Sequence, residues 1–267
     1  MKEARIIRNL PYAQYGNRTL LLDLHLPGGS EGLCPVILWV CGGGWRGCSK
    51  DGAPAWLVEH GFAVASILYR VSSEAIAPAN IHDCKAAVRW LRANAHTHRL
   101  DPDRIGAFGS SAGGHLVALL GLSQGVKELE GNGGNAEQSS AVQAVCDFCG
   151  PSDLTRIAIP EIRKNFALLY EVTAQYLGGP VEERRELARL VSPLSYVSRA
   201  CPPMLIVHGK EDNVVPVEES LGLHEALKSA GADVTLQVLE DAGHGWEQQR
   251  TNDSVASFFR QPLKQRS

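Results

Sequence analysis

Apolar positions along the chain form short continuous runs, separated by stretches in which they recur at helical spacing. Residues 4–10 and 19–26 are strand-like, and Tyr15-Gly16-Asn17-Arg18 between them predicts a hairpin turn. From residue 35 onward the runs have the length and composition of strands buried on both faces of a parallel sheet. These predicted strands cover residues 35–40, 62–69, 104–108, 142–148, 203–207 and 234–239.

Helical stretches lie between the predicted strands. In residues 78–95, Ile81, Cys84, Val88 and Leu91 follow one another at three- and four-residue steps and form a single stripe. Residues 112–122, 217–230 and 248–259 are the other predicted helices. Alternating strands and helices favour βαβ units in one sheet covered on both faces, so we expect residues 1–267 to form a single α/β domain.

Two stretches depart from this alternation. Residues 123–140 are rich in Gly, Asn, Gln and Glu and predict a solvated loop. Residues 152–198 form a long insertion between two strands, with helical character at 166–170 and 182–190. Two interpretations stay open for this insertion: a helical cap over the functional site, or a peripheral excursion.

The composition is that of an ordinary globular protein, with 267 residues, 44% hydrophobic and 21% charged. A net charge of −3 gives no reason to expect nucleic acid or a membrane as a partner. No run approaches the roughly 18–20 apolar residues that span a bilayer. The N-terminal residues lack the apolar segment of a signal peptide, which predicts a cytoplasmic protein, although a trimmed secreted chain would look the same.

The chain has seven cysteines, and an odd number scattered over this length predicts reduced thiols rather than a disulfide framework. Cys146 and Cys149 have a C-x-x-C spacing, but they lie in an apolar run. We therefore interpret them as buried strand thiols. No cluster has metal-ligand spacing, and we expect neither a metal nor a cofactor.

The strongest chemical motif is Gly109-Ser110-Ser111-Ala112-Gly113, a G-x-S-x-G sequence between a predicted strand and a predicted helix. A nucleophile on such a sharp turn needs small neighbours, because larger side chains would collide with the backbone. The glycine spacing selects Ser111 rather than Ser110. The following helix begins there, and its N-terminus favours developing negative charge.

A serine hydroxyl needs a base to become a good nucleophile, and nine histidines compete for that role. His244 lies in a glycine-flanked loop after the last predicted strand, and this type of sheet places its sites in such loops. His208 is the main rival, but its place at the end of an apolar strand favours a structural hydrogen bond. His115 lies one helical turn beyond Ser111 and is expected to point away from it.

The base must be oriented by an acid. Asp212 lies in the loop directly after the strand at 203–207 and is the first candidate. Asp153, after the strand at 142–148, and Glu211 are the alternatives, ranked in that order.

A hydrolase of this kind also needs donors for the tetrahedral oxyanion. Cys41-Gly42-Gly43-Gly44-Trp45 directly follows the strand at 35–40, and three consecutive glycines let backbone N–H groups converge on one point. We expect Gly43 and Gly44 to donate, together with Ala112, the residue after the nucleophile. A plain glycine-rich turn is the alternative.

Together these residues resemble the α/β-hydrolase superfamily, in which the triad order along the chain is Ser, Asp, His. Over residues 19–260 the chain is similar to bacterial feruloyl/acetyl-xylan esterase-like proteins and to hormone-sensitive-lipase-like esterases, an esterase/lipase branch with an H-G-G-G-W loop. Further motifs that carry the resemblance are Tyr69-Arg70, Asp83 with the AAVRWL segment at 86–91, Ser192-Pro193-Leu194, His208-Gly209, Val215-Pro216 and Gly243-His244-Gly245.

The resemblance implies an α/β-hydrolase fold: a mostly parallel, doubly wound sheet with an N-terminal antiparallel hairpin and a helical insertion. Arg70 and Asp83 are expected to have a structural role. The chain departs from the family at Cys41, where relatives have a histidine that supports the glycine loop. A thiol there would orient the loop less firmly, and it predicts sensitivity to alkylating agents.

The expected activity is that of a serine carboxylesterase acting on small esters, including acetyl or feruloyl esters of plant polysaccharides, through an acyl-enzyme. Trp45, Trp246 and Tyr69 are expected to bind substrate rings, with packing of the glycine loops as the alternative. Arylformamidase or exopeptidase-type amide hydrolysis is the second hypothesis, and a non-catalytic ligand-binding homologue the third. Phe258 and Phe259 suggest a homodimer surface, but core packing explains them equally well.

Overall fold

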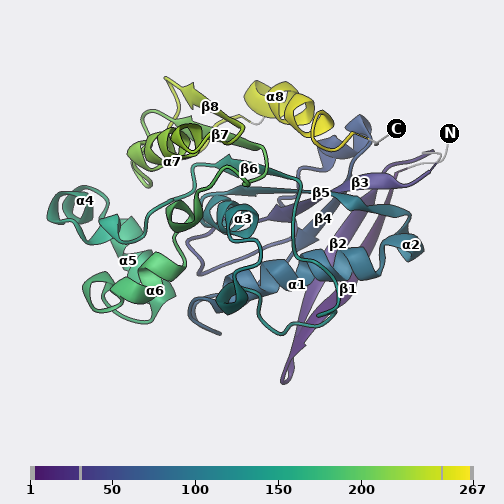
Figure 1. Cartoon of the computed structure of the whole chain (residues 1–267), viewed down its shortest axis with the longest axis horizontal. Helices are drawn as coiled ribbons and strands as arrows, with labels where there is room; N and C mark the ends of the chain where they lie inside the picture. Colours follow the sequence, from purple (N-terminus) through teal and green to yellow (C-terminus); the bar gives the residue numbers. More distant parts are fainter. Residues whose placement is uncertain (1–3, 30–31, 248, 265–267) are drawn as a thin grey trace.

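All eight strands of the protein lie in one sheet, as seen in a computed structural model that describes residues 4–29, 32–247 and 249–264. The strand order is β1-β2-β4-β3-β5-β6-β7-β8 (Figure 1). The strands are β1 Arg5–Tyr15, β2 Arg18–Leu26, β3 Cys34–Val40, β4 Ala63–Ile67, β5 Leu100–Ser110, β6 Ala144–Phe148, β7 Met204–Gly209 and β8 Val234–Leu239. Each overlaps a strand predicted from the apolar pattern, and β1 and β5 are several residues longer than predicted.

The antiparallel part of the sheet is confined to its N-terminal edge. β1 pairs antiparallel with β2 through a two-residue turn in which Gly16 has φ +55°, and β2 pairs antiparallel with β4. The pairs from β4 through β3, β5, β6 and β7 to β8 are all parallel. The carboxyl ends of β3, β5, β6, β7 and β8 therefore meet at one edge, and the loops that follow them converge there.

Helices cover both faces of the sheet, and α1 and α8 lie on opposite sides of it (Figure 1). One apolar core packs α1, α3 and α7 against the sheet, and a second packs α8 against the other face. The α-helices are α1 Ala79–Ala93, α2 Ala95–His98, α3 Ala112–Leu122, α4 Pro160–Asn165, α5 Ala167–Leu177, α6 Arg185–Leu190, α7 Glu218–Ser229 and α8 Gln249–Arg260. Short 3₁₀ segments are η1 Ala55–His60, η2 Lys127–Leu129, η3 Arg156–Ala158, η4 Val181–Glu183 and η5 Pro193–Tyr196.

The helix boundaries differ from the prediction in one respect. The helix predicted over 78–95 breaks at Asn94, where the backbone leaves helical geometry and α2 begins. Asn94 uses its side-chain amide to bond the Trp90 carbonyl, a local bond that competes with continuation of the helix. Residue 248, the first position of the helix predicted at 248–259, lies outside the described residues.

The segment at 123–140 is less solvated than its composition predicts. Lys85 and Arg89, both buried on α1, form ion pairs with Glu130 in this segment, at 2.8 and 3.3 Å. Ser140 also donates to Glu130. The prediction of a solvated loop was therefore wrong for its centre, because buried cations on a neighbouring helix hold it down.

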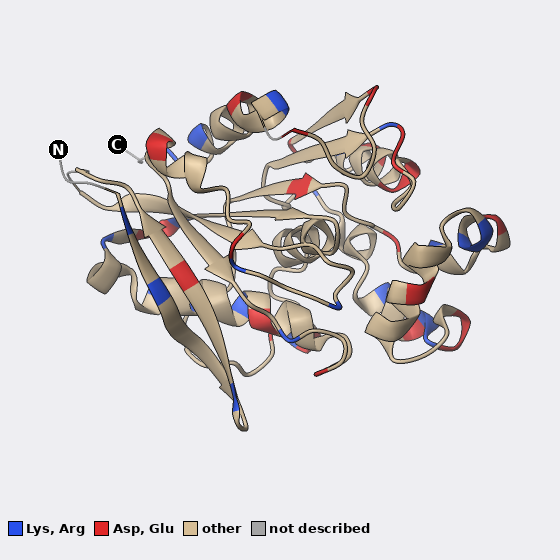
Figure 2. Cartoon of the chain, turned by 180° about the vertical axis from the view of Figure 1, so that it is seen from behind, with Lys and Arg blue, Asp and Glu red and all other residues tan. Residues whose placement is uncertain are grey.

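Along the ribbon of the described chain, acidic and basic positions are interspersed (Figure 2). Arg70 and Asp83 form a salt bridge of 2.7 Å, and Asp83 is fully buried.

Phe259 is fully buried between α8 and the sheet and Phe258 packs beside it, so core packing accounts for the pair and a dimer surface there is not supported. Within the described residues, no helix combines the length and apolar character needed to span a membrane.

Candidate active site

Ser111 lies on a sharp turn between β5 and α3. Its φ of +57° is a conformation that non-glycine residues rarely adopt, and its N–H is held by the Phe148 carbonyl at 2.7 Å. A Cβ at Gly109 would lie 2.3 Å from the Gly113 carbonyl oxygen, and one at Gly113 would lie 2.0 Å from that of Val40. The small residues of the pentapeptide are thus a steric requirement of the turn.

His244 bonds Ser111 through one ring nitrogen and Asp212 through the other. The Ser111 hydroxyl donates to His244 Nε2 at 2.9 Å, and His244 Nδ1 donates to Asp212 Oδ2 at 2.7 Å. The Nδ1 atom must carry the hydrogen because an ionised carboxylate can only accept. The three predicted residues therefore form a continuous hydrogen-bonded relay, although 133 and 32 positions along the chain separate its members.

The structure distinguishes Asp212 from the alternative acids. Asp153 uses its carboxylate to cap Thr155, and Glu211 is an exposed neighbour. Asp212 is buried, and its Oδ1 accepts hydrogen bonds from the amides of Val214 and Val215 at 2.8 and 2.9 Å. Burial opposes its charge, but hydrogen bonds from His208 and His244 outweigh burial and hold the pKa of Asp212 well below its usual range.

The glycine loop after β3 faces Ser111 across a cavity. Within the part of the chain that the structure describes, the N–H groups of Gly43, Gly44 and Ala112 donate to no other protein group. All three residues line this cavity together with Ser111. Gly43 and Gly44 have φ +113° and +58°, values that explain the need for glycine. A Cβ at Gly42 would lie 2.8 Å from the Ser110 carbonyl oxygen, so the loop approaches the nucleophile turn closely.

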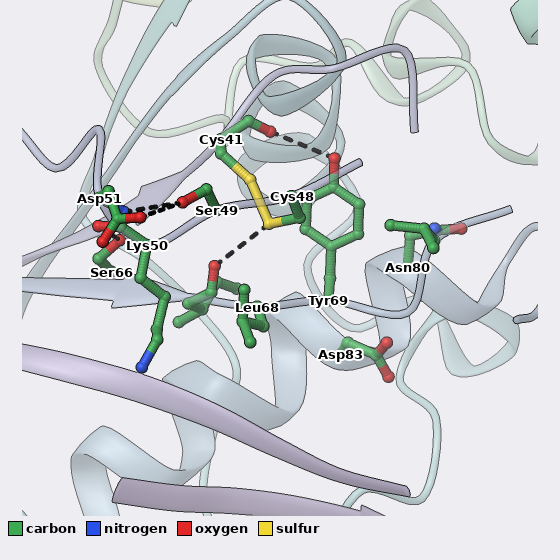
Figure 3. The surroundings of a disulfide bond; sticks show 12 residues. Cys41, Cys48, Ser49, Lys50, Asp51, Ser66, Leu68, Tyr69, Asn80 and Asp83 are labelled. Carbon is green, nitrogen blue, oxygen red and sulfur yellow. Dashed lines mark hydrogen bonds between the residues drawn. A yellow bond between two sulfur atoms is a disulfide. The ribbon is translucent and has the colours of Figure 1, made fainter. Parts of the chain in front are cut away.

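Cys41 is not a free thiol, as the sequence had suggested, but forms a disulfide with Cys48 (Figure 3). The two Cα atoms are 5.7 Å apart, and the bridge encloses residues 42–47, which include the whole glycine loop. The prediction of uniformly reduced thiols was wrong at this pair. The loop between the two cysteines folds back on itself, and their seven-residue spacing matches no disulfide motif that the sequence could have shown. Alkylation of Cys41 would require prior reduction. Cys34, Cys84, Cys146, Cys149 and Cys201 are free, and the C-x-x-C thiols are buried as expected.

Trp45 and His115 anchor the far end of the glycine loop. The Trp45 indole N–H donates to His115 Nδ1 at 3.2 Å, and His115 Nε2 donates to the Val191 carbonyl at 2.7 Å. Burial lowers the pKa of His115 to about 4, so its ring is neutral at pH 7. Trp45 is only 1% exposed and stacks on Tyr176, so packing of the loop explains most of its surface.

Two of the residues expected to contact substrate lie elsewhere. Tyr69 is 1% exposed and donates from its hydroxyl to the Cys41 carbonyl, beside the disulfide (Figure 3). It supports the loop, and the prediction that it stacks on substrate was wrong. Trp246 packs against Phe148 and borders a second, smaller cavity of about 100 Å³ that touches His244 and not Ser111.

The cavity above Ser111 has a volume of about 510 Å³ and mostly apolar walls. Leu168, Leu169 and Val172 of α5 form one wall, and Val214 and Val215 form another. The helices α4, α5 and α6 form a group beyond one end of the sheet (Figure 1), and of these α5 reaches the site. Part of the insertion at 152–198 thus has the position that a cap requires.

The sequence had not drawn attention to Cys149 as a neighbour of the site. Its sulfur and ligand atoms of Asp212 and His244 lie within 4.8 Å of one another, a donor set a metal could use. The bonds between His244, Asp212 and Ser111 already occupy the histidine nitrogens, and burial raises the pKa of the Cys149 thiol to about 12. The arrangement fits proton transfer between Ser111 and His244 better than metal binding.

The strand order, the nucleophile turn and the relay after β5, β7 and β8 define an α/β-hydrolase. A profile of the BD-FAE family matches residues 22–227, and the chain belongs to this family.

The chain is similar to proteins described as esterases. It is 33% identical to "Esterase LipQ" of Mycobacterium tuberculosis (strain ATCC 25618 / H37Rv), over 90% of the chain and 57% of that protein. It therefore spans little more than half the length of that curated relative. Among solved structures, a "truncated form of carbohydrate esterase from gut microbiota" superposes with a TM-score of 0.85 at 31% identity, covering 99% of this chain and 98% of that one. A butyrate-bound esterase, Est2 of Thermogutta terrifontis, superposes with a TM-score of 0.80 at 27% identity, covering 99% and 97%.

Proposed function

We propose that this protein is a serine carboxylesterase that hydrolyses small esters with short acyl groups through an acyl-enzyme. The observation that carries the proposal is the Ser111–His244–Asp212 relay, directed into a cavity that the Gly43, Gly44 and Ala112 amides also border. Relatives and structural neighbours described as esterases support it, one of them bound to butyrate.

The residues give each step of the reaction a defined role. Ser111 attacks the ester carbonyl while His244 Nε2 takes its proton, and Asp212 stabilises the resulting imidazolium. The three amides hold the oxyanion, and His244 then protonates the departing alcohol. Water, deprotonated by His244, releases the acid from Ser111.

The walls of the cavity favour uncharged acyl groups. Leu168, Leu169 and Val172 offer an apolar surface, and Arg46 at the rim is paired with Glu171 at 2.7 Å. Acetyl and feruloyl esters of plant polysaccharides are the natural substrates we would test first, since a structural neighbour is a carbohydrate esterase.

The test is hydrolysis of a p-nitrophenyl ester series from acetate to decanoate by the wild type and Ser111→Ala. We expect activity that falls as the acyl chain lengthens, and a loss of roughly 10³-fold or more in the variant, because the nucleophile is gone. Acetylated xylan, methyl ferulate and N-formylkynurenine would follow. A folded wild type that cleaves only the formamide would overturn the proposal in favour of an arylformamidase.

A further inference from the structure

A second histidine lies against the acid of the relay. His208, at the end of β7, has no solvent exposure, and its Nε2 atom lies 3.1 Å from Asp212 Oδ2. This is the same carboxylate oxygen that accepts from His244 Nδ1 at 2.7 Å. Two imidazoles therefore share one oxygen of Asp212.

The other contacts of His208 define which of its nitrogens carries hydrogen. Nε2 also lies 3.0 Å from the Val215 carbonyl, and since both of its neighbours can only accept, Nε2 must carry a hydrogen. Nδ1 lies 2.7 Å from the Ser220 hydroxyl, which is able to donate to it. Ser220, at 1% exposure, thus fixes the ring so that Nε2–H lies between the Val215 carbonyl, its hydrogen-bond acceptor, and the acid.

We propose that His208 is a positioning residue of the esterase, which shares Asp212 Oδ2 with His244 and thereby sets both the orientation and the basicity of the relay. The inference rests on the proposed function. Its chemistry follows from the contacts of the carboxylate: Oδ1 accepts from two backbone amides, and Oδ2 accepts from His244 and lies 3.1 Å from His208 Nε2, so four groups orient Asp212. A donor from His208 also withdraws negative charge from the oxygen that stabilises protonated His244.

The charged and titratable groups around Asp212 are few. His208 from β7 and His244 from the loop after β8 bond it, and the buried Cys149 thiol after β6 lies beside it. Asp147 of β6 faces His208, and burial raises the pKa of this carboxyl to about 6. Removal of His208 would leave His244 as the one ring in contact with Asp212 among these groups.

The first test compares His208→Leu with His208→Gln. In the leucine variant we expect kcat to fall about tenfold or more with little change in KM, because the acid is less firmly oriented. We also expect the acid limb of the kcat profile to move up by roughly 0.3–1 pH unit, because His244 becomes more basic. Glutamine places an amide donor near the position of Nε2. It should restore most of kcat and return the acid limb close to its wild-type position.

A matched control separates positioning from stability. Ser192 is buried and makes two hydrogen bonds, to Leu154 and Ala188, away from the relay. Ser192→Ala should lower stability without moving the acid limb. An acid limb that stays in place in His208→Leu, or that moves equally in Ser192→Ala, would refute the positioning role.

A measurement on the unaltered protein makes the inference independent of activity and of folding of the variants. In ¹⁵N-histidine NMR of the wild type, His208 should carry hydrogen on Nε2, with its Nδ1 shifted as an acceptor. If the esterase assay fails while this signature is present, the proposed function falls and the assigned tautomer of His208 stands. A His208 ring with hydrogen on Nδ1 alone would overturn the inference, whatever the activity.

Discussion

His115 shows how a single neutral ring can link pH to stability. Its nitrogens hold Trp45 and Val191, and burial lowers its pKa to about 4 from an ordinary 6.5. Because the unfolded chain binds a proton more readily, the contribution of His115 is complete above pH 6.5 and is lost as the pH falls toward 4. Asp147, whose pKa is raised to about 6, acts in the opposite direction over much of this range.

We therefore predict that His115→Gln will differ from the wild type in pH dependence. The wild type should be the more stable at pH 7, and the gap should narrow by about 2–3 kcal/mol at pH 4.5, because glutamine does not titrate. Urea unfolding at the two pH values measures the difference. A gap that is the same at both would show that His115 does not carry this dependence.

The disulfide and the glycine loop act as one structural element. The Cys41–Cys48 bridge encloses the loop, while Tyr69 bonds its first carbonyl and Trp45 anchors its end. This is the position where relatives are expected to have a supporting histidine. Here a covalent bridge closes the loop that carries Gly43 and Gly44, both of which line the cavity.

We predict that opening the bridge lowers kcat and changes KM little. Loss of one oxyanion donor costs about 10²–10³-fold, so a loosened loop that keeps its amides should cost about tenfold. The measurement is p-nitrophenyl acetate hydrolysis by Cys41→Ser/Cys48→Ser and by the wild type under reductant. Cys201→Ser, at a free cysteine that borders neither the loop nor the cavity, is the control. Equal kcat in all of these would rule out a role for the bridge in catalysis.

Helix α5 supplies the wall that should determine acyl length. Leu168 lines the cavity and is 52% exposed, so its truncation removes wall without removing core. In Leu168→Ala we expect the hexanoate-to-acetate ratio of kcat/KM to rise about tenfold, the low end of the roughly 10–200-fold that one methylene is worth in an enclosed pocket, because this wall is half exposed. Leu221→Ala on α7, at 44% exposure and away from the cavity, should leave the ratio unchanged. An unchanged ratio in both variants would mean that α5 does not contact the acyl group.

At the scale of the whole molecule, the second core depends on α8. Phe259 packs on Phe62 and Phe108, and Gly106 leaves room for its ring, since a Cβ there would lie 2.8 Å away. Phe259→Ala should destabilise the protein by about 3–5 kcal/mol through the cavity it creates. Phe258→Ala, at a half-buried residue, should lower the free energy of unfolding much less. Denaturant unfolding of both variants measures this, and equal losses would contradict the assignment of Phe259 to the core.

Much of the fold was predictable from the sequence because it depends on local pattern. The parallel strands β3, β4, β6 and β7 are apolar runs, and α3 begins and ends where the pattern places it. The Ser111 turn was predictable because its glycines are required sterically within five residues. The Asn94 break was not, since one side-chain bond decides it.

The missed features of the site are side-chain contacts that no motif marks, whether the partners are near in the chain, as in Cys41–Cys48, or far apart, as with Cys149. The pairing of Cys41 with Cys48, the approach of Cys149 to the relay and the bond from His208 to Asp212 have no spacing rule. Tyr69 and Trp45 were predicted to lie near the site and do, but on the inner side of the loop. Proximity was thus easier to predict than the direction in which a side chain points.

The edge position of β8, the strand that precedes the loop with His244, affects how the protein loses activity. β8 is an edge strand with one paired neighbour, and most of its residues are partly exposed, whereas β5 and β7, which precede Ser111 and Asp212, are flanked on both sides. Local fraying of such an edge takes less free energy than global unfolding. Mild heat or denaturant would therefore separate His244 from an otherwise intact nucleophile. The protein would lose its activity reversibly before it unfolds globally.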